Sequence, residues 1–321
     1  MKVGIHPAVR AYLDVRRQYF CRIETTVDGK LFATPRGWED LSELVTVYER
    51  LGRVADRDVV SEYIQFPKIA KDFANYLELY HKYQNDYQVP EILKGAIPPG
   101  AIEKLEKAAF DERISVVSLL LSGLNEQFRT VSRTAEMLEL RMKKLRELRQ
   151  SGAFETTQTA VGEEAPALQR FAGMLEEFRQ EQAHLAESGL LSRQEQRTYR
   201  ETERALEQDL QALRREGISD GSAVWEWLRE QFGADSDRYE VQVEQAGQAL
   251  EHAFNFMEAA FANGQEMVLF VTELNTGYYS VRFLQEYECE RYYQYNENLL
   301  FAREEQELRD AFEAADNTPM I

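Results

Sequence analysis

The longest regular pattern of hydrophobic positions lies in the middle of the chain. Apolar residues alternate in steps of three and four over roughly four heptads, at Ile114, Val117, Leu121, Leu124, Phe128, Val131, Ala135, Leu138, Met142 and Leu145. This spacing predicts one long helix with a coiled-coil or bundle seam. After an aperiodic segment, residues 151–167, the spacing resumes at Leu168, Phe171, Leu175, Phe178 and Leu185. We therefore expect the second helix to fold back on the first as an antiparallel hairpin.

The pattern after this hairpin predicts further helices. Ser192 and Glu195 have the spacing of a capping box, which opens a polar helix running to about residue 215. A short aromatic helix, Val224 to Phe232, is expected to close at Gly233. Helices are expected next at about 237–262 and 265–312, the second with a possible kink or close backbone contact at Gly277, and residues 313–321 should fray.

The first 95 residues show a different organisation. A helix is expected at 7–20, beginning with Pro7. The segments 22–27 and 30–33 flank Asp28 and Gly29, a pair that favours a two-residue turn and so predicts a small β-hairpin. Helices are expected at about 38–52, 56–65 and 67–88, of which the first stops at Gly52 and the last begins at Pro67.

One helix start in this region offers a candidate binding residue. Thr34 is a suitable cap and Pro35 suits the first helical position. The apolar stripe of the helix is formed by Trp38, Leu41, Val45 and Tyr48. Arg36 lies roughly 150° from the centre of that stripe, so we expect its guanidinium to be free. Beside the N–H groups at a helix start, it could bind a phosphate or a carboxylate.

Composition and charge indicate an all-α protein with two regions. Glycine (17) and proline (8) are scarce in the 321 residues, as in long helices. Residues 1–95 hold 14 basic and 14 acidic side chains, so the net charge of −18 belongs to residues 96–321. The helix breaker Ile97–Gly100 lies at the same place. We expect domains at 1–95 and 96–321, the second with an arm at about 101–215, acidic on its outer face, and C-terminal helices at about 222–312.

Charge and cysteine usage also limit the class of partner. An acidic surface repels nucleic acid and anionic lipid, so neither is expected as a partner. Cys21 and Cys289 are far apart and belong to no paired motif, which favours reduced thiols in a cytoplasmic protein. No signal-peptide core and no apolar stretch approaching 18 residues is present.

The residues around Arg36 carry a resemblance to a known family. The matching positions are Ala33-Thr-Pro-Arg-Gly-Trp-Glu-Asp-Leu-Ser42, Tyr48-Glu49, Gln65, Ile69-Ala70-Lys71, Phe73-Ala74, Lys82-Tyr83 and Asp86-Tyr87-Gln88. Together they resemble the C-terminal part of MoxR-type AAA+ ATPases, over residues 1 to about 95. A second stretch, residues 266–274 with Tyr278-Tyr279-Ser280, resembles the extension that follows the lid in one branch of that family.

The resemblance implies a small helical lid followed by a helical extension. It implies that Arg36 is the sensor 2 residue, which touches the terminal phosphate of a nucleotide. It also implies ATP and magnesium for the complete ATPase and a chaperone-like remodelling role. The implied partners are the core or a neighbouring subunit and, often, a separate protein with a von Willebrand factor A domain. Homo-oligomers are implied only when the core is present.

The phosphate-binding loop of such an ATPase is missing from the sequence. The only Gly-Lys pair is Gly29-Lys30, which Leu31 follows, and Glu24 stands where the first glycine of the loop should be. We therefore expect neither ATP hydrolysis nor a bound cofactor from this chain alone. From the resemblance we expect the chain to be either a piece that begins just after the core or a natural product that has lost it.

Three other interpretations remain from the sequence. A stand-alone helical scaffold that retains an inactive lid is the main alternative. The pairs Glu78/His81 and Glu181/His184 have the spacing of di-iron bundle ligands, but both are expected to face outward, which favours coincidence over a metal site. The tyrosines at 278, 279, 287, 292, 293 and 295 could form a binding surface, although a helix buried on several sides explains them better.

Overall fold

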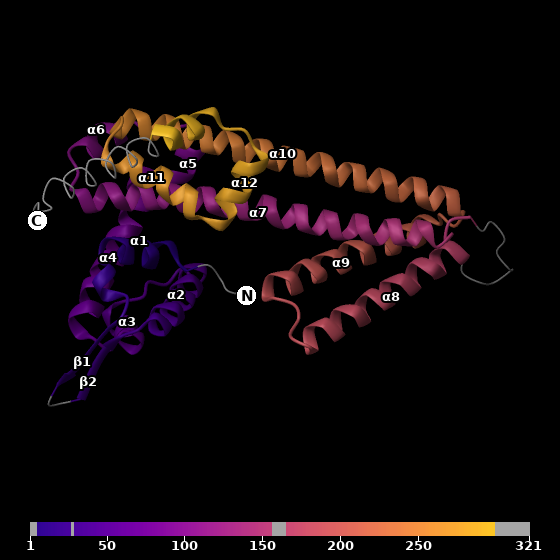
Figure 1. The fold of residues 1–321 in the computed structure, drawn as a ribbon, viewed down its shortest axis with the longest axis horizontal. Coiled ribbons are helices and arrows are strands. Elements are labelled where there is room, and N and C mark those ends of the chain that lie inside the picture. The colour runs from indigo at the N-terminus through magenta and orange to yellow at the C-terminus, as the bar shows by residue number, and fades with distance from the viewer. Residues whose placement is uncertain (1–4, 27–28, 156–164, 299–321) are drawn as a thin grey trace, which may run out of the picture. The chain divides into compact units, whose positions relative to one another are not determined.

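The computed structural model describes residues 5–26, 29–155 and 165–298 (Figure 1). In these ranges 79% of the chain is helical, and its one sheet is a two-stranded antiparallel hairpin, which confirms the predicted all-α class with a short β-hairpin. Two compact units divide it. The terminal unit contains described residues 5–128 and 246–298, and the middle unit contains residues 129–155 and 165–245.

The terminal unit begins with short helices around the hairpin. Proline occupies the first helical position of three of them, where its missing N–H leaves no donor unpaired. The elements in order are α1 (Pro7–Val15), the 3-10 helix η1 (Arg17–Tyr19), β1 (Arg22–Thr26), β2 (Gly29–Ala33), α2 (Pro35–Arg50), α3 (Arg57–Tyr63), α4 (Pro67–Tyr87) and α5 (Val89–Leu93).

Aromatic side chains form the centre of this part of the core. Tyr12, Trp38 and Phe73 are each at most 1% exposed, and their ring centroids lie 5.1 to 5.7 Å apart. Tilted and edge-on pairs of this kind stabilise a core beyond the apolar area they bury. The indole N–H of Trp38 donates to the carbonyl of Tyr19 at 3.0 Å, so the buried polar atom is satisfied. The stripe predicted for α2 is therefore its buried face, with Tyr48 half-buried at the end.

The hairpin pairs in a register two residues away from the predicted one, since the predicted turn would pair Thr25 with Phe32, whereas Thr25 pairs with Lys30. Thr26 is paired with Gly29, which is thus the first residue of β2 and has φ of 133°. The two-residue turn predicted at Asp28 and Gly29 is wrong for Gly29, because that glycine belongs to the ladder. Val27 and Asp28 lie outside the described residues. Along the other edge of β2, the N–H of Phe32 donates to the carbonyl of Gln65 at 3.1 Å.

The terminal unit is completed by later helices. The predicted breaker is confirmed, since residues 94–100 separate α5 from α6 (Ala101–Glu106). The other elements are the first half of α7 (Phe110–Gln150), the last part of α10 (Gly221–Phe261), α11 (Gln265–Thr276) and α12 (Tyr278–Glu286). Residues 290–298 are helical. The continuous helix expected at 265–312 is therefore interrupted, at Gly277 as anticipated and again at 287–289. Residues 299–321 lie outside the described ranges.

The first half of α7 packs against the N-terminal helices. The hydroxyl of Tyr87 donates to Glu112 at 2.7 Å, and the hydroxyls of Tyr76 and Ser115 lie 3.2 Å apart. A Cβ at Gly123 would lie 2.5 Å from the side chain of Leu93. The compact units thus divide inside α7 and α10, which differs from the ranges 1–95 and 96–321 expected from charge.

The middle unit is built from parts of four helices. They are the second half of α7, α8 (Pro166–Glu187), α9 (Arg193–Glu216) and the first part of α10. Helices α8 and α9 lie side by side (Figure 1), and the predicted capping box of Ser192 and Glu195 begins α9. One apolar core joins all four helices, with Leu145, Leu148, Leu168, Phe171, Leu175, Phe178, Leu206, Leu210, Leu213, Val224 and Leu228 as its larger members.

Two expectations about this region are wrong. Helix α10 continues through Gly233, which was expected to end a helix, and a Cβ there would meet no atom within 4 Å. The roughly 1 kcal/mol that an internal glycine costs a helix is too small to end one that is packed along its length. The second wrong expectation is that the arm, residues 101–215, is acidic. This range holds 18 basic and 20 acidic side chains, so the acidic excess lies in residues 216–321, which hold 6 basic and 22 acidic side chains.

Candidate functional site at the start of α2

The turn that begins α2 is fixed by its first residues. Thr34 has extended backbone angles, and its hydroxyl accepts the N–H of Gly37 at 3.1 Å. Pro35 follows at the first helical position. A threonine cap and a proline at this position are the local chemistry that the sequence predicted. The helix therefore starts at Pro35, three residues earlier than the periodicity alone suggested.

Gly37 allows another helix to approach this turn closely. A Cβ built on Gly37 would lie 2.6 Å from the backbone carbonyl oxygen of Tyr63, the last residue of α3. A side chain at this position would clash with the carbonyl oxygen, and a backbone atom cannot rotate away as a flexible side chain can. The absence of a side chain at Gly37 thus sets how closely α3 approaches the start of α2.

Arg36 lies on the solvent side of the turn. Its side chain is 77% exposed, while Trp38 and Leu41 on the other face are 1% and 0% exposed. The sequence suggested a free guanidinium, and this expectation is wrong. Asp40 lies 3.0 Å from the guanidinium and Glu39 lies 3.8 Å from it. Both carboxylates belong to α2 itself, at the i+4 and i+3 positions, where such pairs are common on helix surfaces.

The backbone amides of the turn contribute little to anion binding. Pro35 has no N–H, the N–H of Gly37 is bonded to the Thr34 hydroxyl, and the N–H of Trp38 donates to the Thr34 carbonyl at 3.0 Å. Of these first residues, only Arg36 keeps an amide outside these bonds. An anion at this place would therefore be held mainly by the guanidinium, which differs from the amide-rich site expected at a helix start.

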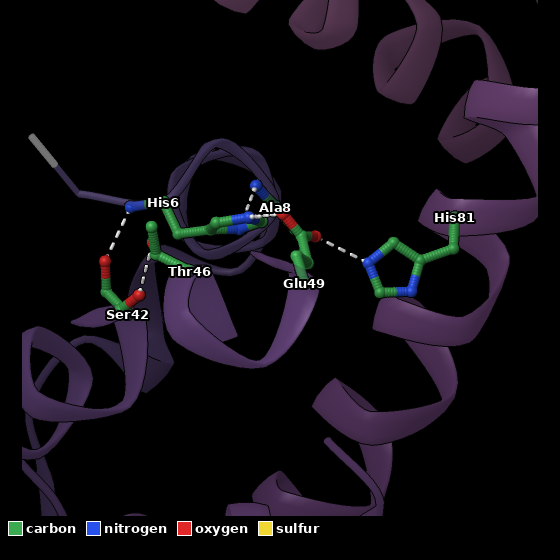
Figure 2. A network of polar contacts seen from close by, with 6 residues as sticks. All are labelled: His6, Ala8, Ser42, Thr46, Glu49 and His81. Atoms are coloured by element: carbon green, nitrogen blue, oxygen red, sulfur yellow. Dashed lines mark hydrogen bonds and ion pairs between the residues drawn. The ribbon is translucent and has the colours of Figure 1, made fainter. Parts of the chain in front are cut away.

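A second polar site joins three helices of the same unit. The Nε2 atom of His6 lies 3.0 Å from one carboxylate oxygen of Glu49, and the Nε2 atom of His81 lies 2.7 Å from the other (Figure 2). His6 precedes α1, Glu49 is in the last turn of α2, and His81 is in α4. His6 is only 6% exposed, and Glu49 is 36% exposed.

The position of the proton on His6 follows from its neighbours. The N–H of Ala8 donates to Nδ1 of His6 at 3.2 Å, so this nitrogen presents a lone pair and caps α1. The Nε2 atom then carries the proton and donates it to Glu49. Burial alone raises the pKa of Glu49, but the hydrogen bonds from His6 and His81 outweigh it and lower the pKa to about 2.

Metal binding does not fit these residues. A metal needs the lone pair of a histidine nitrogen, and the proton on Nε2 of His6 occupies that position. Of the two Glu-x-x-His pairs, Glu78 and His184 are exposed, while Glu181 bonds to Lys144 at 2.8 Å. No group of three or more potential metal ligands occurs within the ranges that the structure describes.

The tyrosine-rich segment is less buried than expected. Tyr278 and Tyr293 are exposed, at 65% and 44%, and Tyr279, Tyr287, Tyr292 and Tyr295 are half-buried. The hydroxyl of Tyr292 donates to Asn275 at 2.6 Å. A helix buried on several sides is therefore not what this segment forms. The hydroxyls of Tyr293 and Tyr295 also bond to helices of the terminal unit, to the carbonyl of Leu284 at 3.1 Å and to Glu258 at 3.3 Å.

Comparisons of the chain with protein-family models, curated proteins and solved structures gave no match. Within the described ranges, no helix combines the length and the apolar character needed to span a membrane.

Proposed function

We propose that the N-terminal helices serve as the nucleotide-sensing lid of a MoxR-like AAA+ ATPase, in which Arg36 contacts the terminal phosphate once a nucleotide-binding core is present. The observation that carries this proposal is the placement of Arg36. It lies on the first turn of α2 and is 77% exposed, on a helix whose opposite face is buried. The residues around it are those of the family motif, and Thr34, Pro35, Gly37 and Trp38 each have a structural role in presenting it.

The ion pairs of Arg36 are compatible with such a role. Exposed pairs like those with Asp40 and Glu39 contribute about 0 to 1 kcal/mol. A charge-assisted hydrogen bond to a phosphate contributes about 1.5 to 3 kcal/mol, and a planar guanidinium can form two of them. A phosphate brought close by a core can therefore displace the carboxylates. Asp40 and Glu39 hold the side chain ready when no phosphate is present.

The remaining parts of the proposal concern partners. The helices beyond residue 95 reach a client or a partner protein, such as one with a von Willebrand factor A domain, and the chain assembles through the core. ATP and magnesium belong to that core, because this sequence offers no phosphate-binding loop. A chaperone-like remodelling role in the cytoplasm follows from the same resemblance.

The first measurement uses the chain by itself. Calorimetric titration with ATP and magnesium should give no affinity tighter than about millimolar, because a single guanidinium replaces the whole phosphate cradle. Micromolar binding would contradict the proposal that the core is elsewhere.

The second measurement uses the complete ATPase. If a core is encoded in frame before these residues or by an adjacent gene, Arg36→Ala should lower ATP hydrolysis about 10- to 100-fold, the value of one lost charged hydrogen bond. Arg50→Ala, at the exposed other end of α2, is the matched control and should leave hydrolysis unchanged. Equal rates for the two variants, or the lack of any encoded core, would overturn the proposal.

A stand-alone interaction scaffold is the second candidate. The intrahelical pairing of Arg36 with Asp40 and Glu39 favours it, since an ordinary surface arginine has the same contacts. An isolated gene without an ATPase core nearby would support this alternative.

A further inference from the structure

The outer end of the α8–α9 hairpin buries almost no apolar surface. On α8 the last buried residue is Phe178, and on α9 the first buried leucine is Leu206. Between them, among the side chains that the structure describes, the buried ones are Thr198 and Thr202. We name residues 179–205 the hairpin tip. It is attached to the apolar core of the middle unit at both of its ends, and among its described side chains the partly buried Tyr199 is the one that packs against that core.

Polar contacts connect the hairpin tip to α7. The carboxylate of Glu136 accepts hydrogen bonds from Gln194 at 3.2 Å and from the Thr198 hydroxyl at 3.3 Å. The ammonium group of Lys144 donates to Glu181 at 2.8 Å. Exchange of the Glu136 bonds for bonds to water changes the free energy little, and Lys144, although only 11% exposed, keeps Glu147 at 3.2 Å when Glu181 moves away, so these contacts resist separation less than an apolar core does.

One buried group of the hairpin tip even favours separation. Thr202 is 0% exposed, and its hydroxyl has no hydrogen-bond partner. A buried hydroxyl without a partner is destabilising, and contact with water would relieve it. The buried Thr202 hydroxyl therefore destabilises the state in which the tip is packed on α7.

The region inward of the tip is held much more strongly. Arg141 of α7 is 2% exposed and is paired with Asp209 of α9 at 2.6 Å and with Asp235 of α10. Separation of a buried arginine from its carboxylates would leave uncompensated charges. Leu206, Leu210 and Leu213 pack in the same part of α9. This region thus stays closed when the tip moves.

We propose that the hairpin tip, residues 179–205, opens and closes on α7 as one element, with the Arg141–Asp209–Asp235 cluster and the adjacent leucines as its fixed base. Tyr199 and Phe178 stack with ring centroids 5.2 Å apart, and Arg179 bonds to Glu203 at 2.7 Å. The Arg179–Glu203 bond joins α8 to α9 inside the tip, so both helices move together, while the stack of Tyr199 on Phe178 lies at the boundary between the tip and the apolar core. The fold thereby contains a conformational device, a helical flap that exposes polar residues when it opens.

Hydrogen exchange of the whole chain tests this proposal. Amides of residues 199–205 should exchange at least about tenfold faster than those of residues 207–213 in the same helix, since local opening leaves the base closed. Thr202→Val removes the unpaired hydroxyl at nearly constant shape, and it should slow exchange of residues 199–205 about 5- to 100-fold.

Thr198→Val is the matched control. It removes a hydroxyl that is bonded to Glu136 and to the carbonyl of Gln194, so it should not slow exchange and should accelerate it about 2- to 10-fold. Equal exchange in the two halves of α9, or no effect of Thr202→Val, would overturn the proposal.

A distance measurement separates opening from fraying of the helix end. In a Cys21→Ser background, which leaves only the buried Cys289, spin labels at the exposed positions Glu139 and Arg200 report the separation of α7 and α9. Two distance populations are expected, and Thr202→Val should shift them toward the shorter one. A single narrow distance in both proteins would contradict movement of the tip as one element.

Discussion

The acid sensitivity of the terminal unit should depend on Glu49. Its pKa is about 2 in the folded chain and about 4.5 in an unfolded one. A depressed carboxylate pKa stabilises the fold above the unfolded value, and this contribution is lost as the pH falls from about 4.5 to about 2. The full shift corresponds to roughly 3 kcal/mol. Because Glu49 is 36% exposed, screening by water lowers our expectation to about 1 to 2 kcal/mol.

Glu49→Gln is the perturbation that isolates this effect. The amide oxygen of glutamine can accept the Nε2 proton of His6, and its NH₂ group can donate to His81, so both contacts persist without the charge. At pH 7 we expect a loss of about 1 kcal/mol, the difference between a charged and a neutral hydrogen bond. Between pH 5 and pH 3 the wild-type chain should lose about 0.5 to 1 kcal/mol more stability than the variant, half of the screened total.

Urea unfolding observed by tryptophan fluorescence measures the stability of the terminal unit, which contains Glu49. The chain has three tryptophans, and Trp225→Phe with Trp227→Phe leaves Trp38, in the terminal unit, as the reporter. Glu43→Gln, exposed on the same helix, is the control and should retain the wild-type acid response. If Glu49→Gln lost as much stability as the wild type between pH 5 and pH 3, the two histidines would not be stabilising the Glu49 carboxylate, and the reasoning would be wrong.

Two glycine substitutions test the packing described above. Gly37→Ala places a methyl group 2.6 Å from the Tyr63 carbonyl. This strain should lower the free energy of unfolding by about 1 to 3 kcal/mol in spite of the better helix propensity of alanine. Thermal unfolding of the terminal unit measures the loss. Gly233→Ala meets open space inside α10 and should stabilise the middle unit by about 0.5 to 1 kcal/mol, seen as a higher urea midpoint. An unchanged stability in the first case, or a loss in the second, would contradict the packing.

Local chemistry allowed much of the fold to be predicted from the sequence. The cap at Thr34, the proline at Pro35 and the capping box at Ser192 act within one helical turn, so a short stretch of sequence contains the whole signal. The seam of α7 is long enough that its period identifies the helix by itself. The exposure of Arg36 followed from the spacing of the apolar residues in α2.

Contacts between distant positions could not be predicted in this way. His6 and His81 lie 43 and 32 positions from Glu49, and no spacing rule connects them. The role of Gly37 depends on the carbonyl of Tyr63, which the pattern around Arg36 does not contain. The continuity of α10 through Gly233 was missed because tertiary packing outweighs the local cost of a glycine.

The close approach at Gly37 has a mechanical consequence for Arg36. Where side chains separate two helices, rotamer changes absorb small shifts, but here the backbone of α2 meets the backbone of α3 directly. The Tyr63 carbonyl is followed at once by the bond from the Ile64 N–H to the Val60 carbonyl, 2.9 Å long, which closes α3. A shift that moves the first turn of α2 toward α3 by a fraction of an ångström must therefore displace the end of α3 as well. Movement of the Arg36 turn in that direction is passed on to α3 without being absorbed by a side chain.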